Sequence, residues 1–170
     1  NQGTREEIRG SIEEEAILRK ARTVDAAFVE GSGRNKRLIA VDLGLKNKTA
    51  IVTGGASNIG KAITEGLFAE GAHVVIADID EKQAERVLAQ LRSSGRDDVL
   101  FVKTDVGDRR QVEHMARCAL ERFGQIDILV NNAGWTNNAL FINKSYEDFE
   151  REIAINLWGP IHCIRAVAPA

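Results

Sequence analysis

The stretch Thr49-Ala-Ile-Val-Thr-Gly-Gly-Ala-Ser-Asn-Ile-Gly-Lys61 decides the fold of this chain. Its first part, Ala50-Ile51-Val52, is a short apolar run that is typical of a buried parallel strand. Thr53-Gly54-Gly55 then predicts a tight turn. From Asn58 onward the apolar residues recur with helical spacing and predict one face of a helix: Ala62, Ile63, Gly66 and Leu67. A strand, a glycine turn and a helix together can present free N–H groups to a phosphate, and a plain structural turn is the alternative.

The composition favours one soluble domain, with or without an appendage. The chain has 170 residues, of which 44% are hydrophobic, and carries a formal net charge of −2 with a pI near 6.0. This balance gives no electrostatic reason to expect binding to nucleic acid or to a membrane surface. No apolar run approaches the roughly 18 residues that span a bilayer, and the N-terminus lacks the apolar segment of a signal peptide. We therefore expect a cytoplasmic protein.

The cysteines and histidines do not indicate a metal site. Cys118 and Cys163 lie far apart without a Cys-x-x-Cys motif, which favours buried small hydrophobic residues over ligands. The three histidines, His73, His114 and His162, have no metal-ligand spacing. The sequence therefore predicts no bound metal.

Three more strands, each preceded by a helix, follow the first strand. The strands are predicted at 73–78, 99–104 and 126–130, and the helices around 84–91 and 112–123. Such units predict parallel strands with right-handed crossovers and helices on both faces of the sheet. We therefore expect the α/β class: a Rossmann-type doubly wound parallel sheet, truncated after the fourth strand and its following helix. Its strand order should be 3-2-1-4, with a crevice at the carboxyl edge between strands one and four.

The last predicted element is one long helix from about Ser145. Its apolar residues are Phe149, Ile153, Leu157, Ile161 and Ile164. Pro160 has no N–H and its ring crowds the carbonyl of Asn156, so we expect the helix to bend there. The hypothesis is that this bend keeps the Asn156 carbonyl open to a water, and an early end of the helix is the alternative.

Residues 1–40 fall outside the strand–helix pattern. Their sequence predicts a helix through about Phe28 and a linker over 31–37, and their nearly balanced charges indicate a solvated face. The chain begins without Met, so we expect a fragment or a processed product. We assign 1–40 to an N-terminal helical extension and linker, and 41–170 to a partial dinucleotide-binding domain.

Two motifs resemble the signatures of the short-chain dehydrogenase/reductase family. Thr53-Gly54-x-x-x-Asn58-x-Gly60 is similar to its Thr-Gly-x-x-x-Gly-x-Gly cofactor loop, with Asn58 in place of the middle glycine. Asn is the residue other than Gly that best tolerates positive φ, so the turn can form. Asn131-Asn132-Ala133-Gly134 matches the second signature without change. The resemblance covers about residues 42–170.

The resemblance implies a site for NAD, with NADP less favoured. The residues that it assigns to the cofactor are Gly54, Ser57, Asn58, Ile59, Gly60, Asp78, Ile79, Asp105, Val106, Asn132, Ala133 and Gly134. Asp78 lies 18 residues beyond Gly60, close to the spacing of a carboxylate that binds both ribose hydroxyls and repels a 2′-phosphate. A helix N-cap is the alternative role for Asp78, although Asp80 suits it equally well. A turn residue is the alternative for Asp105.

The resemblance also places Asn156, in Asn-x-x-Gly, in the catalytic set. The family's other catalytic groups are a serine and Tyr-x-x-x-Lys, in which the tyrosine is the general acid/base. The only tyrosine here, Tyr146, is followed four residues later by Glu150. We therefore expect the truncated, inactive cofactor-binding part of a homo-oligomeric oxidoreductase. Its substrates would be secondary alcohols or ketones, including hydroxyacyl thioesters. A non-catalytic nucleotide-binding or interaction module is the alternative.

Overall fold

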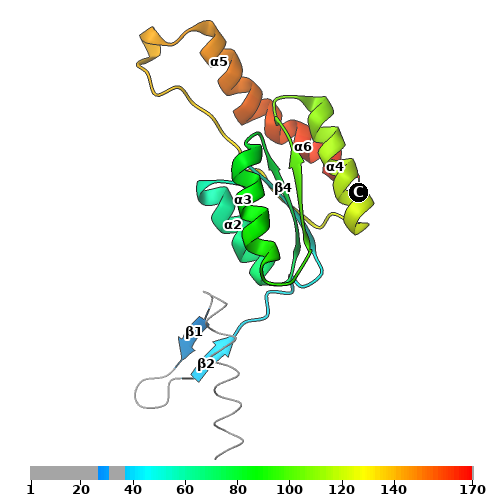
Figure 1. Cartoon of the computed structure of the whole chain (residues 1–170). Coiled ribbons are helices and arrows are strands. Elements are labelled where there is room, and N and C mark those ends of the chain that lie inside the picture. Colours follow the sequence, from blue (N-terminus) through cyan, green and yellow to red (C-terminus); the bar gives the residue numbers. More distant parts are fainter. Residues whose placement is uncertain (1–26, 31–36, 170) are drawn as a thin grey trace, which may run out of the picture. The chain divides into compact units, whose positions relative to one another are not determined.

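The computed structural model describes residues 27–30 and 37–169 of the chain (Figure 1). The chain divides into two units, Asn1–Gly44 and Leu45–Ala170. In the first unit, β1 (Ala27–Glu30) pairs antiparallel with β2 (Arg37–Ala40). Ala27 and Phe28, predicted as the end of a helix, therefore lie in a strand. Arg37, predicted as the last residue of a linker, begins the second strand. Each strand holds a short apolar, β-prone run, and pairing satisfies the backbone of both. The rest of that predicted helix and linker lies outside the described residues.

The second unit contains a parallel sheet of four strands. They are β3 (Thr49–Thr53), β4 (His73–Asp78), β5 (Val99–Lys103) and β6 (Ile128–Val130). Their order in the sheet is β5-β4-β3-β6. Counted along this unit, that order is 3-2-1-4, which confirms the predicted doubly wound fold.

Helices cover both faces of this sheet (Figure 1). One face packs against α2 (Asn58–Ala69) and α3 (Glu81–Arg92), and the other against α4 (Arg109–Phe123) and α6 (Gly159–Val167). Alternate residues of each strand serve alternate faces, which is why the strands read as continuous apolar runs. The helices predicted around 84–91 and 112–123 are confirmed as α3 and α4, which bury Ala84, Val87 and Leu91 and Val112, Met115, Ala116 and Ala119, respectively.

The buried face of α2 differs from the predicted one. Gly60, Thr64 and Phe68 are buried on this helix, whereas Ala62 and Gly66 are exposed. The face is therefore rotated by part of a turn from the predicted one. The cause is the tight packing of the glycine loop at the start of the helix, which draws Gly60 inward.

The last helix is not one uniform α-helix. It consists of α5 (Tyr146–Ile153), a π-helical segment η2 (Ala154–Trp158) and then α6. The N–H of Gly159 bonds to the carbonyl of Ala154, five residues earlier. Pro160 lies in the first turn of α6, where a missing N–H is tolerated. The helix continues to Val167, so the alternative of an early end is wrong, and the irregular segment includes Asn156, at which the bend was predicted. The water proposed at the Asn156 carbonyl stays a prediction.

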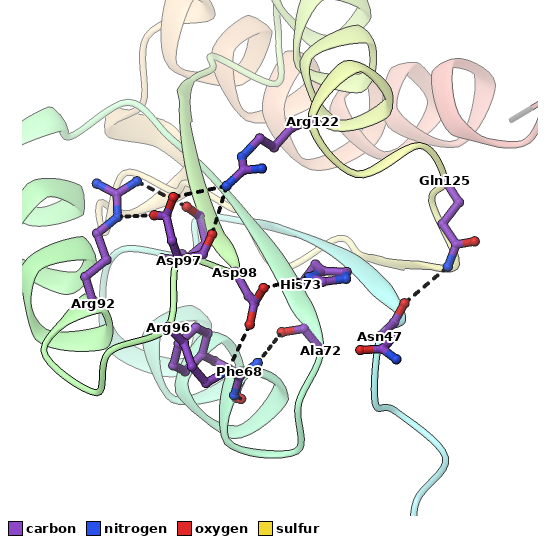
Figure 2. Close-up of polar contacts among 11 residues, drawn as sticks. Asn47, Phe68, Ala72, His73, Arg92, Arg96, Asp97, Asp98, Arg122 and Gln125 are labelled. Carbon is purple, nitrogen blue, oxygen red and sulfur yellow. Dashed lines mark hydrogen bonds and ion pairs between the residues drawn. The ribbon is translucent and has the colours of Figure 1, made fainter.

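A charged cluster lies at the edge of the sheet where the parallel strands begin (Figure 2). We call it the rear cluster; it consists of Arg92, Arg96, Asp97, Asp98 and Arg122. Arg96 donates to the carbonyl of Phe68 at 2.6 Å and to the Asp98 carboxylate at 2.9 Å. Arg122 donates to the main-chain and side-chain oxygens of Asp97 at 3.1 and 3.0 Å. These contacts join the loops before β4 and β5 to α2 and α4.

Asp127, just before β6, is a second ionic anchor at this edge. Its carboxylate accepts hydrogen bonds from Lys48 Nζ and from the Thr49 N–H, both at 2.8 Å. The Lys48 ammonium, followed by that N–H, holds the pKa of Asp127 below its usual value of 3.8. The carboxylate therefore stabilises the fold only while it is ionised.

Replacing Asp127 with asparagine should lower the free energy of unfolding by about 1–2 kcal/mol at pH 7, because the charged hydrogen bonds are lost. A carboxyl group whose pKa is lower in the native state than in the unfolded state contributes its full stabilisation at a pH above the unfolded-state pKa. That stabilisation is lost as the pH falls through the native-state pKa. The difference between Asp127→Asn and the unsubstituted chain should therefore shrink below about pH 4. Urea unfolding at pH 7, 5 and 3 measures it. An equal difference at pH 7 and pH 3 would contradict the assignment.

Candidate nucleotide-binding site

A cavity of about 430 Å³ lies at the edge where the strands end, opposite the rear cluster. All twelve residues that the sequence assigned to the cofactor line it. The cavity is also lined by residues that were not predicted as cofactor contacts: Ala77, Asp80, Gln83, Thr104, Trp135, Arg151 and Ile155. Asp80 was noted only as a helix cap. Ala77 and Thr104 could have been predicted as lining residues from their positions at the ends of predicted strands. The sequence offers no comparable signal for the other residues.

The loop between β3 and α2 forms the floor of this cavity. Gly54 has φ 64° and Asn58 has φ 47°, so Asn58 adopts the positive φ expected of it. A Cβ on Gly60 would lie 2.0 Å from the carbonyl oxygen of Gly54, so only glycine fits there. The Thr64 hydroxyl donates to the Gly55 carbonyl at 3.0 Å and ties the loop to its helix.

The N-terminus of α2 carries no side-chain cap. Ser57 stands at the N-cap position in extended conformation, without a side-chain hydrogen bond, and the first turn contains no acidic residue. By contrast, α3, α4 and α5 are capped by Asp80, Asp108 and Ser145, respectively. The first N–H groups of a helix have no acceptor within the helix. In α2 they lie at the cavity wall, where the helix dipole favours an anion.

Asp78 ends β4 and is 8% exposed. One carboxylate oxygen accepts from the Ala56 N–H at 3.0 Å, and the other accepts from the Asp80 N–H at 3.1 Å. The cap of α3 is Asp80, which accepts from the Gln83 N–H at 3.0 Å. The alternative role of Asp78 as that cap is therefore wrong. Its carboxylate is fixed beside the glycine loop, and its contact with a ribose stays a prediction.

Asp105 and Val106 follow β5 and line the cavity next to Asp78. The Asp105 carboxylate accepts from the Gly107 N–H at 2.9 Å, so this residue does form a turn. A Cβ on Gly159 would lie 2.8 Å from Val106 Cγ2, so α6 packs closely behind this strand end. Asp105 thus combines a turn with a position in the cavity wall.

Thr53 joins the two signature loops. Its hydroxyl accepts from the N–H groups of Asn132 and Ala133, each at 3.0 Å, and donates to the Val130 carbonyl at 3.3 Å. The Asn132 side chain in turn donates to the carbonyls of Thr53 and Gly54, at 2.9 and 3.2 Å. The loop after β6 is therefore held against the end of β3.

Asn156 holds the main chain of Trp135. Its Oδ1 accepts from the Trp135 N–H at 2.9 Å, and its Nδ2 donates to the Trp135 carbonyl at 2.8 Å. A Cβ on Gly134 would lie 3.3 Å from the same Oδ1. Asn156 does not itself line the cavity, so its catalytic role stays a prediction.

The described residues contain no group of three or more His, Cys, Asp or Glu side chains placed to hold a metal ion. Cys163 is fully buried, which raises the pKa of its thiol to about 11 and fits a small core residue. Cys118 is half-buried. No helix in the described part of the chain is long and apolar enough to cross a membrane.

Comparison with known proteins agrees with this geometry. The family model of the short chain dehydrogenases matches residues 48–170. The chain belongs to this family. Among curated proteins, an uncharacterized oxidoreductase of Thermotoga maritima is 46% identical over 73% of this chain and 48% of its own length. Galactitol 2-dehydrogenase of Agrobacterium fabrum is 40% identical over 73% and 47%. The chain thus spans about half the length of the curated relatives it matches.

Solved short-chain dehydrogenase structures share the fold. One from Burkholderia phymatum, in complex with NAD, superposes with a TM-score of 0.71 at 35% identity, over 74% of this chain and 44% of that one. The 3-ketoacyl-(acyl-carrier-protein) reductase of Brucella melitensis, complexed with NADH, gives 0.69 at 33% identity, over 74% and 50%. The parallel sheet of this chain is therefore the sheet of a short-chain dehydrogenase.

Proposed function

We propose that the chain binds NAD(H) in this cavity, as the cofactor-binding part of an oxidoreductase that transfers hydride to or from a secondary alcohol or ketone. The uncapped N-terminus of α2, beside the glycine loop and facing Asp78, is the observation that carries the proposal. The loop and the helix would hold the pyrophosphate, and Asp78 the adenosine ribose. The solved relatives with NAD and NADH support this choice of cofactor.

The charge around Asp78 supports NAD over NADP. A 2′-phosphate on the ribose would place negative charge against the Asp78 carboxylate, which is fixed by two main-chain N–H groups and cannot turn away without breaking them. The neighbouring loop residues Ala56 and Ser57 offer no positive charge. Phosphate recognition would need an Arg or Lys there.

Replacing Asp78 with alanine should narrow the preference for NAD over NADP by about 1–3 kcal/mol, the scale of one lost charged hydrogen-bonding group. Asp78→Asn removes the charge and keeps an acceptor for the loop, so it separates loss of repulsion from loss of loop structure. Calorimetric titration of both cofactors measures the preference. Asp80→Ala serves as the control, because it removes a carboxylate that lies two residues away in the same cavity wall. Tighter binding of NADP than NAD by the unsubstituted chain would overturn the assignment.

We also propose that this chain binds the cofactor without turning over substrate. The sequence holds no Tyr-x-x-x-Lys, and Tyr146 is 84% exposed on α5, away from the cavity lining. We infer that residues 1–40 are a separate extension and that the full-length enzyme is a homo-oligomer. Ile153, Leu157 and Ile164, each about half exposed on the last helix, support the oligomer. A non-catalytic module remains the second candidate, because it needs only the binding site. Hydride transfer by a version extended along the reading frame would distinguish the two.

A further inference from the structure

Arg151 is the one basic side chain among the described residues that line the nucleotide cavity. It lies on α5, whereas the cavity floor comes from the loop between β3 and α2. Three carboxylates share the lining with it: Asp78, Asp80 and Asp105. A dinucleotide carries two negative charges on its pyrophosphate, which these carboxylates would repel. The positive charge of Arg151 would reduce that repulsion.

The guanidinium of Arg151 is held by an aromatic platform. Its central carbon lies 4.3 Å from the centroid of the Trp135 ring. The Trp135 main chain is in turn fixed by both polar atoms of the Asn156 side chain. A cation over an indole face is stabilised by the ring quadrupole while its N–H donors stay available. The platform therefore positions the charge and leaves it free to act on a ligand.

No carboxylate among the described residues lies within ion-pair distance of Arg151. Two of the acidic side chains of α5 have other partners: Glu152 pairs with Lys144, and Asp148 forms the capping box with Ser145. The position of Arg151 in the last turn of α5 and its contact with Trp135 both favour a cation there. The cavity beside it leaves room for a further partner, an anionic ligand.

We propose that Arg151 is an electrostatic determinant of dinucleotide binding: its cation, set on Trp135, attracts the pyrophosphate and offsets the three carboxylates of the cavity. This inference rests on the proposed function and names the residue that makes an acidic cavity suitable for an anion. The competing role is packing alone, in which the flat guanidinium covers the indole and its charge is irrelevant. Lysine keeps the charge without the flat surface, and glutamine keeps part of the stem without the charge.

The test titrates the unsubstituted chain, Arg151→Gln and Arg151→Lys with NAD, and with neutral adenosine as a competitor. We expect Arg151→Gln to weaken NAD binding about fivefold at 0.1 M salt and less than twofold at 1 M salt. The effect should fade because the Debye length falls from about 10 Å to about 3 Å between these salt concentrations. Arg151→Lys should stay within about twofold of the unsubstituted chain, and adenosine binding should be unchanged in both variants. Arg117→Gln, on the exposed surface of α4 and outside the cavity, makes the same change in net charge and should have no effect.

Equal loss in Arg151→Gln and Arg151→Lys, or equal loss of NAD and adenosine binding, would overturn the inference in favour of packing. Unchanged NAD binding by Arg151→Gln would also overturn it, and would leave the proposed function intact. If the unsubstituted chain bound neither ligand, the proposed function would fail and this inference with it.

Discussion

Replacing Gly60 with alanine should abolish NAD binding and lower the free energy of unfolding by about 3 kcal/mol. The new methyl group would lie 2.0 Å from the carbonyl oxygen of Gly54 and 2.5 Å from Asn132 Nδ2. The first of these atoms belongs to the main chain and cannot rotate away, so the glycine loop itself must move. That movement would also displace the N-terminus of α2 from the cavity. Urea unfolding and calorimetric titration with NAD measure the two effects.

Gly66 provides a matched control on the same helix. It is exposed, and a Cβ there would meet nothing within 4 Å. Alanine at this position should therefore stabilise the chain by about 0.5–1 kcal/mol through helix propensity, and leave NAD binding unchanged. Similar effects of Gly60→Ala and Gly66→Ala would show that the close approach to Gly54 does not limit this loop.

Replacing Thr53 with valine should lower the free energy of unfolding by about 2–4 kcal/mol. Thr53 is 1% exposed, and its hydroxyl is the acceptor for two main-chain N–H groups of the loop after β6. Valine has nearly the same shape, so the loss comes from leaving these donors without a partner in a partly buried place, at about 1–3 kcal/mol for each fully buried group. Because the loop then separates from β3, NAD binding should also weaken.

Serine at position 53 keeps the hydroxyl and removes one methyl group, so Thr53→Ser should lose only about 1 kcal/mol. Denaturant unfolding of both variants, with NAD titration, makes the comparison. A larger loss for serine than for valine would mean that the methyl group, rather than the hydrogen bonds, holds the two loops together.

The sheet could be predicted from sequence because its two central strands, β3 and β4, are buried on both faces and the outer two, β5 and β6, are partly buried. Such strands read as uninterrupted apolar runs, and β4 begins and ends where its run does, at His73 and Asp78. The floor of the cavity could be predicted because its backbone leaves little choice of residue. Gly54 needs a positive φ, and Gly60 has no room for a side chain. These requirements leave short, recognisable patterns.

The remaining features depend on residues that meet only after folding. Arg151 and Trp135 lie 16 positions apart, and no local pattern indicates that one stacks on the other. The rear cluster joins Arg96 to the carbonyl of Phe68 from 28 residues away. Single arginines and aspartates in loops and on exposed helix faces have no periodicity that marks such partners. In β1 and β2, the apolar runs are too short to separate strand from helix by pattern alone.

The π-helical segment 154–158 sets the rotational phase between the two halves of the last helix. A π-turn adds about one residue to an α-helical turn, and each α-helical residue advances the helix by about 100°. Because the wider turn accommodates this extra residue, forcing the same residues into regular α-helical geometry would turn α5 by about that angle relative to α6. Gly159 would still face Val106, but Arg151 would swing off Trp135 and leave the cavity wall. The wider turn of this segment thus allows α6 to pack in the core while Arg151 of α5 lies in the cavity wall.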